Sequence, residues 1–576
     1  MSSYTIRRPL EPGEKDAFPG YSDLLASLLF HRGITDAGLA ARFVRPDYAR
    51  DVHDPSLLKD ADKAAARIIH AIQNDELIAV YTDYDCDGIP GAGMFHDFFK
   101  RIGYTKFIIY IPHRHNEGFG VNKEAIDELA EKGVKLLITV DCGISDLEAI
   151  EHAQSKGIEV IITDHHESPE RLPPAVAIID PKQADCAYPD KNLCGTGVAF
   201  KLIQAILKQN RFGLKEGHEK WLLDLVGIAT LSDMVPLTGE NRVFAHYGLQ
   251  VLRKSPRKGL QRLLSKLKIS QPHVTEDDIA FMIAPRINAA SRMGAPMDAF
   301  KLLVADNDIE ANESADHLDR INNERKGVVA SLVKEVKKTI NDRYGQSGAL
   351  GGIPSVIVLG NPEWRPSLLG LAANSCAEEF RRPVFLWGRD GDGGIKGSCR
   401  SEGTTHVVEL MRAMPAGIFT EFGGHKNSGG FGVINESIHH LEERLNETAI
   451  RLNNASEAIP AVGEDLLIDS ELKLNQVNHS LYEDIHKLAP FGAGNRKPVF
   501  LFKRVTPNSV RRFGKTNEHI ELRFNNISAI SFFGVTNEWA KTISANQPVD
   551  LVANVEKSMF MNRPEIRLRI VDVIYP

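Results

Sequence analysis

The sequence predicts an α/β protein in which a parallel sheet is followed by a smaller α/β domain and a terminal β-barrel. Between about residues 60 and 235, short apolar runs alternate with helical patterns. Residues 308–344 contain almost no Gly or Pro, and five strand-like runs follow one another after about residue 497. A chain of 576 residues is also too long for one hydrophobic core, so several domains are expected.

The parallel sheet is predicted from four apolar runs at residues 77–81, 107–111, 136–140 and 160–163. Helical patterns at 122–132 and 146–156 separate some of these runs. Strands that are apolar throughout are typical of parallel sheets, because helices cover both of their faces.

A helical connector is predicted next, because apolar positions such as Leu318, Ile321, Val328, Leu332 and Val336 recur at roughly helical spacing. One or two long helices would satisfy this pattern. A second α/β region follows, with strands at 355–359 and 384–387, glycine-rich stretches at 391–397 and 422–432, and a helical and linker segment at about 437–463.

The last region resembles a small β-barrel of the OB-fold type, with strands in the runs VFLFKRV, HIELRF, ISAISFF, VDLVANV and EIRLRIVDVI. Residues 501–576 hold 11 Lys or Arg against 7 Asp or Glu, whereas the whole chain has a net charge of −7. We therefore expect an N-terminal extension (1–55), a sheet domain (56–305), a helical connector (306–346), a second α/β domain (347–460) and a barrel (461–576).

Composition excludes several classes of protein. The six cysteines are scattered and form no CxxC pair, which argues against a disulfide framework or a zinc knuckle. The N-terminal residues lack the apolar core of a signal peptide, and no run of about 18 apolar residues could span a membrane. These features predict a cytoplasmic protein without a membrane segment.

Carboxylates and histidines gather where apolar segments end. Asp83, Asp85 and Asp87 follow the first strand, Asp141 follows the third, Asp164-His165-His166 follow the fourth, and Asp233 follows the apolar segment 227–231. Ligands of open parallel sheets bind at the carboxyl ends of the strands. Carboxylates with one or two imidazoles suit Mn²⁺ or Mg²⁺, and two such ions could activate a water against a phosphodiester.

A single aspartate at a strand end is as often a helix N-cap as a ligand. The same strand-to-loop transition recurs at all four places, however, which favours a metal site. Asp83 is the weakest candidate of the first cluster. Cys86 and Cys142, beside the carboxylates, are expected to be small buried core residues and not metal ligands.

These segments resemble motifs of the DHH phosphoesterase superfamily, in order DYDCDG, VDCG, TDHH and ATLSD. FGGH at 422–425 resembles the glycine-rich motif of the DHH-associated domain. Residues 284–290 (APRINAA), 396–401 (KGSCRS) and 490–495 (PFGAGN) resemble segments of the RecJ family of exonucleases. The resemblance covers nearly the whole chain in the family's order.

The resemblance implies a role for each motif residue. One ion would be held by Asp85 and Asp141, and the other by Asp87, Asp141, His165 and Asp233. His166 would contact the scissile phosphate, with Asp164 orienting the histidines. The related pyrophosphatases carry a histidine where this chain has Tyr81, which implies a thinner protein shell around the first ion.

The resemblance also implies a pocket for a terminal 5′-phosphate, since arginine binds phosphate bidentately. The residues expected to bind substrate are Arg114, Arg286, Asn288, Arg325, Ser398, Arg400 and His425, together with Arg511, Arg512 and Lys515 of the barrel. The last three are expected to contact the backbone of a single strand.

The leading hypothesis is a metal-dependent exonuclease that degrades single-stranded DNA from 5′ to 3′, releases 5′-mononucleotides and serves DNA repair and recombination. Single-strand binding protein and a helicase are the partners that the resemblance implies, and a monomer is expected. A phosphodiesterase for short oligonucleotides or cyclic dinucleotides, a non-catalytic scaffold and a pyrophosphatase are the alternatives. The terminal barrel and the intact ligand set argue against these three.

Overall fold

A five-stranded parallel sheet forms the first α/β domain of this computed structural model, which describes residues 4–345, 352–391, 393–402, 405–455, 466–559 and 564–575. The strand order is β3-β2-β4-β5-β6, and all pairs are parallel. The strands are β2 (Ile78–Thr82), β3 (Phe107–Tyr110), β4 (Leu136–Val140), β5 (Glu159–Thr163) and β6 (Ala177–Ile179). The parallel sheet is as predicted, and β6 is an additional strand of three residues, too short to stand out in the sequence.

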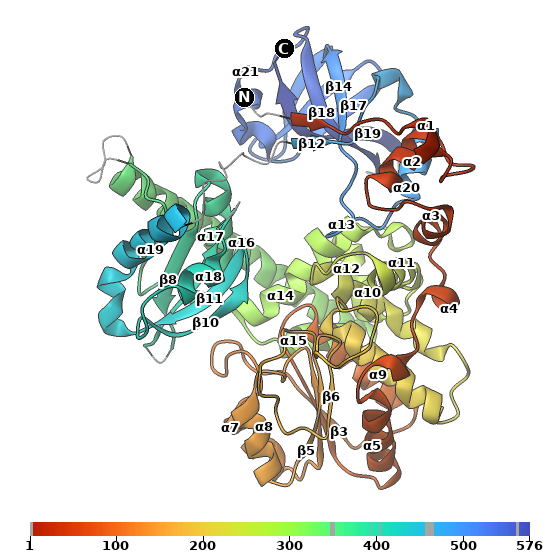
Figure 1. The fold of residues 1–576 in the computed structure, drawn as a ribbon, viewed down its shortest axis with the longest axis vertical. Coiled ribbons are helices and arrows are strands. Elements are labelled where there is room, and N and C mark those ends of the chain that lie inside the picture. Colours follow the sequence, from red (N-terminus) through yellow and green to blue (C-terminus); the bar gives the residue numbers. More distant parts are fainter. Residues whose placement is uncertain are drawn as a thin grey trace. The chain divides into compact units, whose positions relative to one another are not determined.

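Helices cover both faces of this sheet. In Figure 1, α7 (Lys123–Glu131) and α8 (Leu147–Ser155) lie on one side, and α5 (Ala61–Gln73) and α9 (Gly195–Gln209) lie on the other. Every residue of β2 and β4 is buried. Their continuous apolar character follows from this double cover.

A helical layer continues the domain. It contains α6 (Gly88–Arg101), α10 (Leu223–Ser232), α12 (Lys258–Lys266), α14 (Ala284–Met293), α15 (Met297–Val304) and α16 (Asp308–Tyr344). The connector is one continuous helix, α16, of 37 residues. The side chain of Asn307 caps its N-terminus by accepting hydrogen bonds from Ile309 and Glu310. Leu318, Leu332 and Val336 are buried as their spacing predicts, whereas Val328 is exposed.

The second α/β domain is built on a mixed sheet with the order β10-β11-β9-β8-β7. Only the β7–β8 pair is parallel. Its elements are β7 (Ile357–Gly360), α17 (Pro366–Phe380), β8 (Val384–Arg389), β9 (Ile395–Arg400), α18 (Val407–Arg412), β10 (Phe419–His425), β11 (Ser428–Val433) and α19 (Leu441–Ala455).

The structure divides into two compact units, one of which holds both α/β domains. The other contains the barrel together with residues 1–54 and 234–249. Its seven-stranded sheet has the order β13-β14-β18-β19-β17-β16-β15. The strands are β13 (Ser470–Glu471), β14 (Phe500–Val505), β15 (Ser509–Phe513), β16 (His519–Phe524), β17 (Ile527–Ser531), β18 (Val549–Ser558) and β19 (Glu565–Ile574). Five strands were expected; β13 and β15 are additional.

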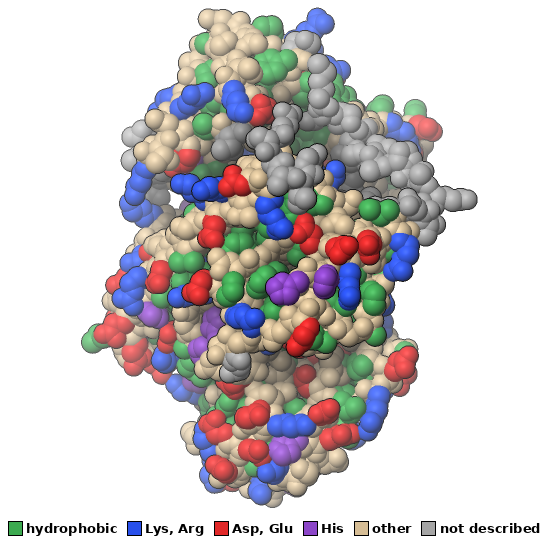
Figure 2. Space-filling model, turned by 90° about the vertical axis from the view of Figure 1, so that its left-hand side faces the viewer, with side chains coloured by type: hydrophobic (Ala, Val, Ile, Leu, Met, Phe, Trp, Pro, Cys, Tyr) green, Lys and Arg blue, Asp and Glu red, His purple; other side chains and the backbone are tan. Residues whose placement is uncertain are grey.

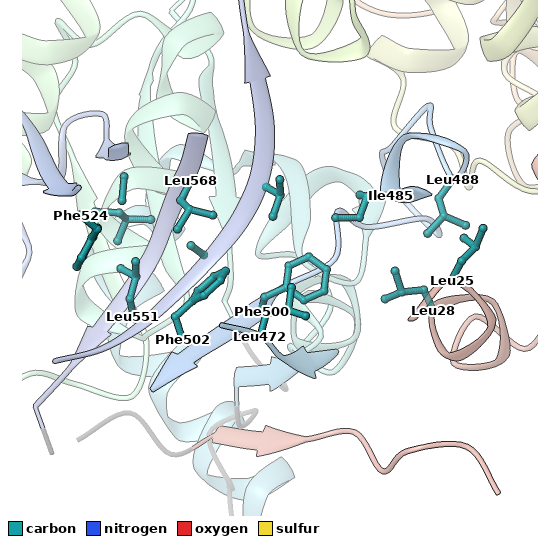
Figure 3. Close-up of a cluster of buried hydrophobic side chains, with 14 of the residues drawn as sticks. Leu25, Leu28, Leu472, Ile485, Leu488, Phe500, Phe502, Phe524, Leu551 and Leu568 are labelled. Atoms are coloured by element: carbon teal, nitrogen blue, oxygen red, sulfur yellow. The ribbon is translucent and has the colours of Figure 1, made fainter. Parts of the chain in front are cut away.

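The N-terminal residues belong to the barrel unit and not to a separate domain. β1 (Tyr4–Ile6) pairs in parallel with β12 (Leu466–Ile468). Leu25 and Leu28 of α2 (Asp23–Phe30) share one buried cluster with barrel residues such as Phe500, and Figure 3 shows α2 beside Ile485 and Leu488. A hydrophobic helix that the sequence left unassigned is thus part of the barrel's core.

The distribution of charged side chains on the surface agrees with the mixed acidic and basic composition of the chain. On the face that Figure 2 shows, acidic and basic side chains are interspersed and do not form one large patch of a single sign. Among the described residues, no helix has both the length and the apolar character needed to cross a bilayer.

Candidate metal centre and nucleic-acid interface

The predicted carboxylates and histidines meet at the carboxyl edge of the parallel sheet. Asp83, Asp85 and Asp87 follow β2, Asp141 follows β4 and the Asp164–His166 segment follows β5. Asp233 is different from what we expected, because it caps the C-terminus of helix α10 and does not follow a strand. An apolar run of this length suits a buried helix as well as a strand.

Three groups of side chains have the spacing of metal ligands, with ligand atoms within 4.8 Å of one another. They are Asp87 with His165 and Asp233, Asp83 with Asp85 and Asp141, and Asp141 with both histidines. Nε2 of His165 lies 3.1 Å from Oδ1 of Asp141, 3.7 Å from Oδ2 of Asp233 and 3.9 Å from Oδ2 of Asp87. Asp141 and His165 therefore connect the groups.

Asp83 belongs to this centre, although the sequence made it the weakest candidate. Its side chain is buried, and its Oδ1 has no hydrogen-bond partner among the described residues. Oδ1 of Asp141 is also buried and accepts no hydrogen bond from the described residues, although Nε2 of His165 lies 3.1 Å away. Two buried carboxylate oxygens without donors fit a site that a cation completes, because such oxygens are otherwise costly to desolvate.

The pKa values of the carboxyl groups also indicate a site that a cation completes. Burial, and then the charge of Asp85, raises the pKa of Asp83 well above its usual range and that of Asp87 to about 6. Burial and neighbouring carboxylates also raise the pKa values of Asp141 and Asp233. Bound divalent ions would remove this repulsion and keep the groups ionised.

The N-terminus of α9 holds Asp87 in place. Its carboxylate accepts hydrogen bonds from the backbone N–H of Gly195 (2.6 Å) and Thr196 (2.8 Å). The helix must approach closely, since a Cβ at position 195 would lie 2.5 Å from the Cβ of Asp141. Asp141 itself has a left-handed backbone with φ +62°. The sequence pattern does not single out Gly195 or Thr196, although a glycine that opens a helix is a signal of such a contact.

The two adjacent histidines differ in protonation. Burial, and then the charge of His166, lowers the pKa of His165 to about 3, which leaves a neutral imidazole suited to metal binding. Burial opposes the charge on His166, but its 2.7 Å hydrogen bond with Asp164 and the charges of Asp164, Asp233 and Asp83 together outweigh burial and raise its pKa to about 9. Asp164 also accepts from the backbone N–H of Ile144 and His165. It lies outside the three ligand groups and contacts His166 directly.

Tyr81, at the position of the histidine in related pyrophosphatases, points away from the carboxylates. Its hydroxyl donates to the backbone carbonyl of Gly120 (2.8 Å), and its ring stacks on Tyr110 with centroids 5.1 Å apart. The ring belongs to the core on the α7–α8 side of the sheet. Tyr81 belongs to none of the three ligand groups, whereas Asp83, two residues later, belongs to one of them.

Arginines gather near the N-terminus of α17. Burial, and then the charges of Arg114, Arg325 and Arg400, lowers the pKa of Arg292 to about 9. Its guanidinium donates to the backbone carbonyl of Ser367 in the first turn of α17. Within the described part of the chain, none of these four arginines forms an ion pair with a carboxylate. Because no carboxylate of the described residues neutralises these charges, the cluster is suited to binding an anion.

The expected substrate residues divide between this cluster and other places. Arg114 lies over the Tyr84 ring at 4.8 Å, and Ser398 and Arg400 share one face of β9. The buried Nε of Arg325 has no partner among the described residues. His425 ends β10, but its side chain lies outside the described residues.

Arg286 and Asn288 are engaged within the protein. The guanidinium of Arg286 pairs with Asp319 of α16 (2.9 Å) and donates to the carbonyl of Met282. Oδ1 of Asn288 accepts from the backbone N–H of Cys86, between the two aspartates Asp85 and Asp87. Arg292, six residues after Arg286 on α14, lies with the other arginines, whereas the resemblance implied this role for Arg286.

The barrel residues lie on β15 and its turn. Arg511 pairs with Glu521 (2.7 Å), Arg512 donates to the carbonyl of Ala540, and Lys515 is exposed. An aromatic cluster of Phe513, His519, Phe532 and Phe533 lies close by, with centroid distances of 4.7–6.3 Å. Arg569 lies over the Phe532 ring at 4.2 Å. Cationic and aromatic groups together are typical of surfaces that bind single strands.

Comparison with known proteins identifies the domains. Residues 77–230 match the model of the DHH family N-terminal domain, residues 354–452 match the DHHA1 domain, and residues 468–572 match the RecJ OB domain.

Whole-chain relatives are also found. A Bacillus subtilis protein named single-stranded-DNA-specific exonuclease RecJ is 34% identical over 553 residues, which cover 95% of this chain and 67% of that protein. The protein of the same name from Haemophilus influenzae is 30% identical, covering 81% of this chain and 82% of its own. The crystal structure of Thermus thermophilus RecJ in complex with Mn²⁺ matches with a TM-score of 0.81 and 25% identity, covering all of this chain and 80% of that one.

Proposed function

The chain belongs to the RecJ family of single-stranded-DNA-specific exonucleases, and from this premise we propose that it removes nucleotides one at a time from the 5′ end of a DNA strand. It is a hydrolase of phosphodiester bonds that acts on single-stranded DNA with a divalent metal ion, Mn²⁺ or Mg²⁺. The observation that carries the 5′ polarity is the unpaired arginine cluster beside the carboxylate centre.

The ligand groups suit two ions. Asp87, His165 and Asp233 would hold one, Asp83 and Asp85 would hold the other, and Asp141 would bridge them. When bound, such ions polarise the phosphodiester and lower the pKa of a bound water. This assignment adds Asp83 to the ligands that the resemblance implied.

His166 and Asp164 would act on the substrate side of the centre. A His166 whose pKa is about 9 is protonated near neutral pH, so it can donate to a non-bridging oxygen of the scissile phosphate. Asp164 orients that ring and stabilises its charge through the 2.7 Å hydrogen bond. His165 stays neutral and presents its Nε2 to the carboxylates.

The arginine cluster would bind the terminal 5′-phosphate. Arg114, Arg292, Arg400 and Ser398 are the candidate contacts, with Arg325 extending the positive surface along α16. Arg292 replaces Arg286 in this proposal because Arg286 is neutralised by Asp319. A 5′-phosphate held at a set distance from the carboxylates places one phosphodiester in reach, which favours release of 5′-mononucleotides.

The barrel would bind the single strand through its cationic and aromatic groups. Arg511, Arg512 and Lys515 lie beside the aromatic cluster described above. We also propose roles in DNA repair and recombination, a cytoplasmic location, a monomeric state, and single-strand binding protein and a helicase as partners, all supported by membership of the family.

The test is digestion of 5′- and 3′-labelled single strands with Mn²⁺ or Mg²⁺. A 5′-labelled strand should release labelled mononucleotide at once, whereas a 3′-labelled strand should shorten progressively. A chelator should abolish both. Immediate release of mononucleotide from the 3′ label would reverse the proposed polarity.

A further inference from the structure

A phenylalanine stands exposed beside the histidine of the candidate centre. Phe119 lies in the loop between β3 and α7, and 56% of its surface is exposed. Its ring contacts the His166 ring edge to face, with centroids 5.7 Å apart and planes at 73°. An isolated exposed apolar residue is ordinary on a surface, but Phe119 contacts the histidine that we propose to bind the scissile phosphate, so it would face the substrate.

The loop backbone, and not burial of the ring, holds Phe119 in this position. The carbonyl of Gly120 accepts the Tyr81 hydroxyl, and the next residue, Val121, donates its N–H to Asp146 (2.7 Å). Gly120 has φ +83°, and a Cβ there would lie 2.6 Å from the carboxylate of Asp146. The protein thus fixes the loop tightly while leaving the aromatic face open.

The start of the same loop is fixed by a second set of bonds. Glu117 accepts hydrogen bonds from the Tyr110 hydroxyl (2.7 Å) and from the backbone N–H of His113 (2.6 Å). Arg114, which lies between His113 and Glu117 in the sequence, belongs to the arginine cluster. One short loop, held by these hydrogen bonds, therefore carries Arg114, a proposed phosphate contact, near one end and the ring of Phe119 near the other.

We propose that Phe119 stacks on the base of the terminal nucleotide, the one that is released. The inference rests on the proposed function: that nucleotide would have its 5′-phosphate at the arginine cluster and its 3′-phosphate at His166. Its base then lies along the loop that joins the two sites. Stacking on an aromatic ring accepts every base, because each base has a π-face, and this suits an enzyme that must digest any sequence.

The test combines a change in the protein with a change in the substrate. Strands with a 5′-phosphate carry either a normal terminal nucleotide or an abasic one, and kcat/KM is measured with the parent and with Phe119→Leu. Stacking of one base is worth roughly a 5- to 150-fold effect. The parent should lose about this much when the terminal base is removed. Phe119→Leu should show a similar loss on the normal strand and little further loss on the abasic strand.

Matched controls exclude a general effect on the loop. Phe119→Tyr keeps the stacking ring and should retain the parent's preference for a terminal base. A strand whose abasic position is the fourth nucleotide should show no coupling with Phe119→Leu. The melting temperature and the stabilisation by Mn²⁺ should be unchanged in both variants.

Three results would overturn the inference. One is an equal fold loss for Phe119→Leu on normal and abasic ends. Another is coupling to the fourth nucleotide instead of the first. The third, which needs no variant, is a parent that is indifferent to loss of the terminal base. Failure of the proposed function would look different, because the parent would then release no mononucleotide from the normal strand.

Discussion

The carboxylate of Asp87 accepts a 2.6 Å hydrogen bond from the backbone N–H of Gly195, the first residue of α9. Through this bond, a helix from a distant part of the chain sets the position of a carboxylate of the candidate metal centre. The positive end of the helix also favours the charged form of Asp87.

Gly195→Ala should therefore impair the centre. The added Cβ would lie 2.5 Å from the Cβ of Asp141, so α9 and both carboxylates must shift. A misplacement of about 1 Å can cost roughly 100-fold in rate, and we expect at least a tenfold loss of nuclease activity with weaker Mn²⁺ affinity. Gly13→Ala is the matched control, because its Cβ meets nothing within 4 Å. Parent-like activity of Gly195→Ala would show that the contact is dispensable.

Asp141→Asn should raise the stability of the metal-free protein while abolishing activity. Burial and four neighbouring carboxylates disfavour the charge of Asp141, so its removal relieves repulsion, and asparagine tolerates the left-handed backbone. The melting temperature with a chelator should rise, and the further rise on adding Mn²⁺ should shrink.

Asp164→Asn is the control for this change. Burial disfavours the charge of Asp164, but its bond with His166, the charge of that ring and the hydrogen bond from the backbone of Ile144 together outweigh burial and lower its pKa. Its neutralisation should therefore lower the metal-free melting temperature. A change in melting temperature in the same direction for Asp141→Asn and Asp164→Asn would contradict the distinction between a ligand carboxylate and an orienting one.

The Asp164–His166 pair should make metal-free stability depend on pH. The folded pKa of His166, about 9, exceeds the unfolded value of roughly 6.5. The folded state thus binds the proton more tightly, and the stabilisation is full below about pH 6.5 and lost as pH rises through about 9. Urea unfolding of the parent and His166→Gln, with a chelator, should show a stability difference that falls across this interval. A difference that is flat or grows with pH would contradict the pairing.

Arg400→Gln should remove the preference for a 5′-phosphate. A charge-assisted contact is worth about 1.5–3 kcal/mol, or roughly 10- to 150-fold. The ratio of kcat/KM for phosphorylated and hydroxyl ends should therefore fall by about this factor. Arg286→Gln should leave the ratio unchanged and lower stability instead, because it leaves Asp319 without its partner. A collapse of the ratio in Arg286→Gln alone would restore the assignment based on sequence.

Leu25→Ala should destabilise the barrel although it lies over 400 residues before it. Leu25 is fully buried in the cluster that includes Phe500 and Leu551, and truncation of a buried leucine costs about 2–5 kcal/mol. Hydrogen exchange of β14 and β18 should accelerate accordingly. Leu39→Ala, at a side chain that is 47% exposed, should change stability by less than about 0.5 kcal/mol. Unchanged exchange in Leu25→Ala would separate the N-terminal helix from the barrel core.

The sequence alone determined the parallel sheet and most of the metal centre. Strands buried on both faces are apolar throughout, and the carboxyl ends of parallel strands meet at one edge, so Asp85, Asp87, Asp141 and His165 could be brought together without coordinates.

Only the tertiary structure decided which of several equivalent residues takes part. Asp83 has the same spacing as its neighbours, and its burial beside Asp85 and Asp141 depends on how the loop after β2 folds. Arg286 and Arg292 lie six residues apart on α14, on different sides of the helix. Packing of α14 against α16 gives Arg286 its partner Asp319 and leaves Arg292 with the other arginines. Likewise, α2 joins the barrel because burial of its leucines needs a surface that local sequence does not specify. Local pattern fixes the period and the polarity of an element, whereas its partners follow from packing between segments far apart in the chain.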